Sequence, residues 1–164
     1  MMETSLLQTK REDWPFIILA SLIFFSALLV TLWDFLIFQK MTFHLSLVNV
    51  AGLGLFFIGI SIRRVAKRTL GKYYSYGLRT LQKHELIKHG IYRYIRHPAY
   101  LAMLIYSLAV PLIFSSLYGF LLMSGLIPCT LYRIKIEESM LLEKFGKEYL
   151  EYMKKTKKMI PLIY

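Results

Sequence analysis

Residues 97–132 read HPAYLAMLIYSLAVPLIFSSLYGFLLMSGLIPCTLY, thirty-six residues without one Asp, Glu, Lys or Arg. A membrane-spanning helix needs about 20 apolar residues, so this stretch is too long for one ordinary span. It is long enough for two short spans joined by a bend near residues 111–116, where a proline and two serines occur. We therefore expect one span over roughly residues 99–114 and a second over roughly residues 117–136.

Two further apolar runs come before this stretch. The first covers residues 16–38 and follows Pro15, a favourable residue for the first position of a helix. The second covers residues 44–62 and contains Gly52, Gly54 and Gly59. The Gly-x-Gly pattern is not a dinucleotide-binding loop, because no strand precedes it. Small residues in a membrane helix instead favour close packing against a neighbouring helix.

Composition identifies the chain as an integral membrane protein. Hydrophobic residues make up 56% of the sequence, above the roughly 45–50% of soluble domains. The net charge is +11, but eighteen of the twenty-one basic residues lie at or after residue 63 and flank apolar segments. This distribution favours contact with anionic lipid rather than with nucleic acid. No metal site is predicted, because the four histidines lack ligand spacing and the chain has a single cysteine, Cys129.

The distribution of basic residues also predicts the topology. The loop after the first span carries only Lys40, whereas residues 63–68 read RRVAKR, so both Arg63 and the N-terminus are expected in the cytoplasm. The predicted fold is all-α and polytopic, with about four transmembrane helices and a fifth left open. Both termini and a cofactor pocket are expected at the cytoplasmic face. Residues 1–164 are expected to form one membrane-embedded domain, with an N-terminal helical hairpin (1–62) and a catalytic core (63–164).

Two segments are expected at the membrane surface. Residues 69–96 are polar and aromatic, and we expect a functional connection with short helical turns. Residues 137–158 place apolar side chains at three- and four-residue spacing, with Lys and Glu between them. This pattern predicts a basic amphipathic helix in the interface, weakened or bent at Gly146.

Ionisable residues lie at two span ends. Arg96 and His97 precede Pro98 at the start of the third span, where such groups indicate either a functional site or headgroup contacts. Arg133 and Glu137 lie four residues apart on one helix face at the end of the fourth span. Their spacing alone is equally compatible with an ordinary intrahelical ion pair.

Taken together, these segments resemble the isoprenylcysteine carboxyl methyltransferases and their phospholipid methyltransferase relatives. The motifs that carry the resemblance are LGKYYS (70–75), HELIKHGIY (84–92), RHPAYL (96–101), the Arg-x-x-x-Glu-Glu of 133–138, and Phe-Gly-x-x-Tyr (145–149) followed by Tyr152. The resemblance covers roughly residues 63–161, all but the first two spans.

The resemblance implies S-adenosylmethionine as the methyl donor, bound at the cytoplasmic surface without a Rossmann domain. It implies that Glu137 contacts the donor and that Arg133 binds the acceptor. The residues implied to line the donor pocket are His84, Glu85, Leu86, Ile87, Tyr92, His97, Pro98, Ala99 and Tyr100. Tyrosine rings suit the sulfonium cation of the donor, a contact worth roughly 0.5–2 kcal/mol.

The chemical identity of the methyl acceptor is implied less directly than that of the donor. A carboxylate, with a pKa of about 4, is already ionised at neutral pH and needs no general base. It needs only a cationic partner such as Arg133 to hold it. An amine or phenol-like hydroxyl would need a base, for which His97 and Glu138 are the first candidates.

The resemblance favours O-methylation of a lipophilic carboxylate such as an isoprenylcysteine, supplied from the bilayer by a small molecule or a prenylated protein. N-methylation of a phospholipid amine and O-methylation of an alkylated phenolic or pyrone lipid are the enzyme alternatives. A lipid-binding or transport component is the non-enzyme alternative.

Overall fold

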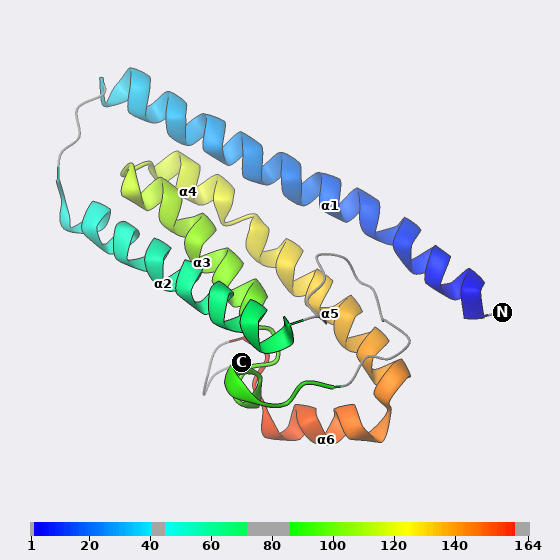
Figure 1. The fold of residues 1–164 in the computed structure, drawn as a ribbon. Helices are drawn as coiled ribbons and strands as arrows, with labels where there is room; N and C mark the ends of the chain where they lie inside the picture. The colour runs from blue at the N-terminus through cyan, green and yellow to red at the C-terminus, as the bar shows by residue number, and fades with distance from the viewer. Residues whose placement is uncertain (1, 41–44, 72–85, 160–164) are drawn as a thin grey trace. The chain divides into compact units, whose positions relative to one another are not determined.

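The computed structural model describes residues 2–40, 45–71 and 86–159, with side chains from residue 15 onward. Every regular element in these ranges is helical, which confirms the all-α prediction (Figure 1). The elements are α1 (Met2–Trp33), η1 (Asp34–Phe38), α2 (Leu47–Leu70), η3 (Gly90–Arg93), α3 (Pro98–Ile113), α4 (Leu117–Met123), α5 (Leu126–Phe145) and α6 (Lys147–Lys155).

Three helical segments are long and apolar enough to cross a membrane: Pro15–Phe38, Leu47–Leu70 and Leu117–Phe145. The fourth predicted span corresponds to the shorter apolar helix α3, so the number of spans stays a prediction. Along α1, Leu22, Phe25 and Leu29 are 63%, 62% and 67% exposed. Such a row of exposed apolar side chains suits lipid rather than water, and the prediction of an integral membrane protein is confirmed.

One predicted helix boundary is wrong. The terminal helix does not begin at Glu137, since α5 passes through that residue and ends at Phe145. Gly146, at φ 52°, then breaks the helix as expected. The basic run 63–68 ends the second apolar run as expected, and α2 continues through it to Leu70. Arg, Lys and Ala are good helix formers, so the chain stays helical where it becomes polar.

By its internal contacts the chain forms two compact units, residues 1–57 with 106–129 and residues 58–105 with 130–164. Within the first unit α1 packs against α4. The contact is close at Gly119, where an added Cβ would overlap Thr31 Oγ1. Ser116 caps the start of α4, and its hydroxyl accepts a hydrogen bond of 3.1 Å from the Gly119 N–H.

Side-chain amides satisfy the backbone at the turn between α3 and α4. Asn49 Nδ2 donates to the Ile113 carbonyl at 2.7 Å and to Ser115 Oγ at 2.8 Å. Gln39 Nε2 donates to the Phe114 carbonyl at 2.8 Å. The last carbonyls of a helix have no partner within it, and leaving them unpaired is costly away from water. These amides therefore stabilise the turn.

In the second unit the C-terminal segment returns to the start of α3. Lys157 N–H donates to the Tyr94 carbonyl at 3.1 Å, and the Lys157 carbonyl accepts from Arg96 N–H at 2.8 Å. His97 N–H donates to the Lys158 carbonyl at 3.0 Å. This short parallel pairing fixes the backbone on which His97 and the first turn of α3 are built.

A buried ion pair reinforces this pairing. Arg96 Nε lies 2.9 Å from Glu138 Oε1, and both side chains are 8% exposed. The Arg96 Nη1 also donates to the carbonyls of Met153 and Thr156. Lys158 Nζ lies 3.4 Å from the other Glu138 oxygen. The Arg96 guanidinium thus joins α5, the end of α6 and the entry to α3, and its burial favours a role inside the protein over the alternative of headgroup contacts.

The glycines of α2 provide a test of helix packing. A Cβ at Gly52 would lie 2.8 Å from the Ile113 nitrogen and 3.0 Å from the Leu112 carbonyl carbon, both backbone atoms that cannot move aside. We expect Gly52→Ala to lower the free energy of unfolding by about 1–3 kcal/mol, measured by unfolding in detergent. Gly54→Ala, where nothing lies within 4 Å, is the matched control. Equal stability of the two variants would contradict the close approach.

The buried ion pair provides a second test. Glu138→Gln leaves the Arg96 and Lys158 charges without their carboxylate, and we expect it to cost about 3 kcal/mol of unfolding free energy. Glu148→Gln is the control, because the pair of Glu148 with Lys88 is exposed and such pairs are worth about 0–1 kcal/mol. Denaturant or thermal unfolding in detergent measures both. Similar losses of unfolding free energy in the two variants would show that the Glu138 ion pair stabilises the fold no more than an exposed pair does.

Candidate active site

The entry to α3 places His97 against α5. Pro98 is the first residue of the helix, a position that needs no backbone N–H, and the His97 carbonyl accepts the N–H of Leu101 at 3.1 Å. His97 is 4% exposed. Its Nδ1 lies 4.0 Å from Glu137 Oε1 and its Nε2 lies 3.4 Å from Glu138 Oε1. The imidazole is therefore held between two neighbouring carboxylates of α5.

Tyr100 joins the two charged residues of α5 that the sequence singles out. Its hydroxyl donates to Glu137 Oε2 at 2.7 Å and accepts from Arg133 Nε at 3.0 Å. The Tyr100 and His97 rings lie 5.8 Å apart. The structure therefore brings four predicted site residues together: His97, Tyr100, Arg133 and Glu137.

The two adjacent glutamates face different surroundings. The Glu137 side chain is 31% exposed, whereas the Glu138 side chain is 8% exposed. Glu138 is surrounded by Arg96, Lys158 and His97. Because its carboxylate is buried and already paired with these groups, Glu138 is poorly suited to act as a general base toward an acceptor. Glu137 keeps the exposure that contact with a ligand requires.

The other predicted site residues lie around this cluster or outside the described ranges. His84 and Glu85 fall outside the residues that the structure describes. Leu86 and Ile87 are half-buried and lead into η3. Pro98 is buried and Ala99 half-buried in the first turn of α3. Tyr92 is buried, and its carbonyl accepts the Tyr152 hydroxyl at 2.6 Å.

Sequence reasoning assigned no role to the two tyrosines of α6 in holding this region. Tyr149 is 1% exposed and Tyr152 6% exposed. Burial raises the pKa of both phenols, to about 12 for Tyr152, so both are neutral at physiological pH. Their three-residue spacing was a signal for a buried face of the helix, but it could not identify Tyr92 as the partner of Tyr152.

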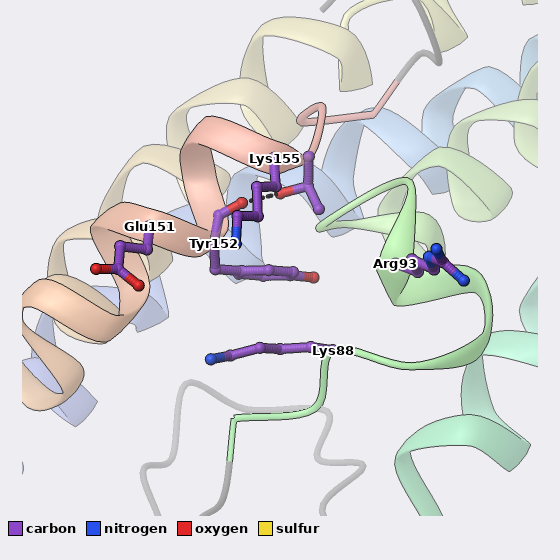
Figure 2. Close-up of a pocket in the computed structure, with 6 residues that line it drawn as sticks. Lys88, Arg93, Glu151, Tyr152 and Lys155 are labelled. Atoms are coloured by element: carbon purple, nitrogen blue, oxygen red, sulfur yellow. Dashed lines mark hydrogen bonds between the residues drawn. The ribbon is translucent and has the colours of Figure 1, made fainter.

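A cavity of about 140 Å³ lies beside Tyr152 (Figure 2). It is lined by Lys88, Arg93, Glu151, Tyr152, Lys155 and Thr156. Figure 2 shows the Lys88 side chain extended alongside the Tyr152 ring. The cavity shares no residue with the predicted site, and we assign the candidate site to the cluster around Tyr100.

The cluster fits a methyl donor with an ammonium group and a sulfonium. Glu137 offers an anionic oxygen, and the Tyr100 ring offers an aromatic face to a cation. The His97 ring lies beside these groups, 5.8 Å from the Tyr100 ring. Among the described residues no group of three His, Cys, Asp or Glu side chains is arranged to hold a metal ion.

Comparison with known proteins agrees with these residues. The model of the isoprenylcysteine carboxyl methyltransferase family matches residues 52–143. A rice (Oryza sativa subsp. indica) protein described as a probable protein-S-isoprenylcysteine O-methyltransferase is 34% identical over 121 residues, covering 71% of this chain and 62% of the relative. The Schizosaccharomyces pombe protein-S-isoprenylcysteine O-methyltransferase is 32% identical over 124 residues, covering 74% and 52%.

The fold agrees as well. The solved structure of the eukaryotic intramembrane Ras methyltransferase superposes with a TM-score of 0.73 at 25% sequence identity. The match covers 91% of this chain and 53% of the solved one, so this chain spans only part of the length of its relatives. The family model covers more than half of the chain and includes Tyr100, Arg133 and Glu137. The chain belongs to the isoprenylcysteine carboxyl methyltransferase family.

Proposed function

We propose that the protein transfers a methyl group from S-adenosylmethionine to the carboxylate of a lipophilic, isoprenylcysteine-like acceptor. The observation that carries this proposal is the pairing of Arg133 and Glu137 through the Tyr100 hydroxyl at the end of a membrane helix. A cationic and an anionic group side by side suit two substrates of opposite local charge. The names of the relatives, protein-S-isoprenylcysteine O-methyltransferases, support the same reaction.

Glu137 would bind the ammonium group of the donor, and the Tyr100 ring would face its sulfonium. The region from His84 to Ile87, together with Tyr92, would supply further contacts to the donor. The family resemblance suggests these roles, and the exposure of the Glu137 carboxylate supports its part in them.

Arg133 would hold the acceptor carboxylate through paired N–H donors. An oxygen of that carboxylate attacks the methyl carbon, the carbon–sulfur bond breaks, and its electron pair stays on sulfur. No proton moves, because the carboxylate is already ionised at neutral pH. The protein's contribution is then to align the two reactants in line and to exclude competing acceptors.

The membrane setting fits a lipophilic acceptor. Arg133 lies within Leu117–Phe145, a segment apolar enough to cross the bilayer. An isoprenoid tail could remain in lipid while its carboxylate reaches Arg133. The basic run 63–68 supports a cytoplasmic location for the site, by the positive-inside rule.

Donor binding tests the role of Glu137. We expect Glu137→Ala in detergent to weaken binding of S-adenosylhomocysteine at least roughly tenfold, because a charge-assisted contact is lost. Glu148→Ala, an exposed glutamate of α6, should bind like the wild type. Isothermal titration measures both variants. Wild-type affinity in Glu137→Ala would remove Glu137 from the donor site.

Acceptor use tests the role of Arg133. We expect Arg133→Ala to retain S-adenosylhomocysteine binding while kcat/KM for a prenylcysteine carboxylate falls by roughly 100-fold, as when the partner of a carboxylate is removed. Lys135→Ala, which removes an exposed cation from the same helix, is the control. Loss of donor binding in Arg133→Ala, or unchanged esterification, would contradict the acceptor role.

A further inference from the structure

The Tyr100 hydroxyl has one proton to donate and lone pairs to accept with. A carboxylate only accepts and a guanidinium only donates, so the direction of each bond is fixed. The proton of Tyr100 points to Glu137 Oε2 at 2.7 Å, and a lone pair receives Arg133 Nε–H at 3.0 Å. The three side chains form a directed chain from Arg133 through Tyr100 to Glu137.

The Tyr100 side chain has less conformational freedom than the side chains of Arg133 and Glu137 that it joins. Arg and Glu side chains have many rotamers, and restricting them costs conformational entropy, whereas tyrosine has only two side-chain torsions. Tyr100 lies in the first turn of α3, two residues after Pro98. The preceding backbone is tied to the C-terminal segment through the hydrogen bond from His97 to Lys158. The backbone that carries Tyr100 is therefore held in place, and so is the position of its hydroxyl.

The bond to Nε also decides how Arg133 can hold an acceptor. A guanidinium can grip a carboxylate through the edge that contains Nε or through the edge formed by the two Nη atoms. Tyr100 engages Nε–H. The Tyr100 hydroxyl therefore restricts the orientation in which the Arg133 guanidinium can meet an acceptor carboxylate.

We propose that Tyr100 is a positioning residue whose hydroxyl orients the Arg133 guanidinium for the acceptor carboxylate. The inference rests on the proposed function and deepens it, because it assigns the orientation of the acceptor clamp to a residue of another helix. Tyr100 acts here through Arg133, in addition to the contact proposed above between its ring and the donor. The ring is retained when only the hydroxyl is removed.

A double-mutant cycle tests the proposal with Tyr100→Phe, Arg133→Lys and the combined variant. Tyr100→Phe should raise the acceptor KM roughly tenfold, as expected for a lost hydrogen bond to a charged group. Lysine has no Nε–H fork, so in the Arg133→Lys background the same substitution should change KM by less than about twofold. Tyr94→Phe, which removes the hydroxyl of a 64% exposed tyrosine, is the control and should match the wild type.

The results of this cycle distinguish failure of the positioning role from failure of the proposed function. An unchanged acceptor KM in Tyr100→Phe overturns the positioning role, and so do single effects that multiply in the double variant. If Tyr100→Phe does not fold, the cycle between Arg133→Lys and Glu137→Gln replaces it: coupled effects support a chain through the hydroxyl, and multiplying effects overturn it. A wild type that binds donor but esterifies no carboxylate acceptor overturns the proposed function, and the positioning role with it.

Discussion

The carboxylate of Glu138 is the point on which the second unit depends. It is buried beside a membrane helix, where an uncompensated charge would be strongly unfavourable. Arg96 and Lys158 neutralise it, at 2.9 Å and 3.4 Å. Arg96 uses its other donors on carbonyls at the end of α6. One buried charge thus connects α5 and the end of α6 to the entry to α3, which lies 42 residues before Glu138 in the sequence.

The same arrangement explains why two adjacent glutamates have different roles. Successive residues of a helix point about 100° apart, so if Glu138 faces the interior, Glu137 must face another side. Glu137 meets the Tyr100 hydroxyl at 2.7 Å and stays partly exposed. His97 lies between the two carboxylates. The structural pair therefore supports the backbone from which the candidate site is built.

Much of this could be predicted from the sequence because it depends on local patterns. Apolar runs indicate membrane helices, a glycine predicts the break at residue 146, and the motifs around His97 and Glu137 indicate the family. The partner of Arg96 could not be predicted, because Glu138 lies 42 residues away and only the packing of α3 against α5 brings them together. The same applies to Tyr100, which the motif associated with the donor but not with Arg133. The boundary expected at Glu137 was wrong because a change in polarity is not a change in helix propensity.

The most direct test of the central claim is the chemical nature of the product. Purified protein would receive S-adenosylmethionine with a labelled methyl group and N-acetyl-S-farnesylcysteine, beside the corresponding carboxamide as a control that lacks the carboxylate. We expect label in the product of the carboxylic acid alone, released as methanol by mild alkali because a methyl ester has formed. Alkali-stable label, or equal labelling of the carboxamide, would contradict the formation of a methyl ester.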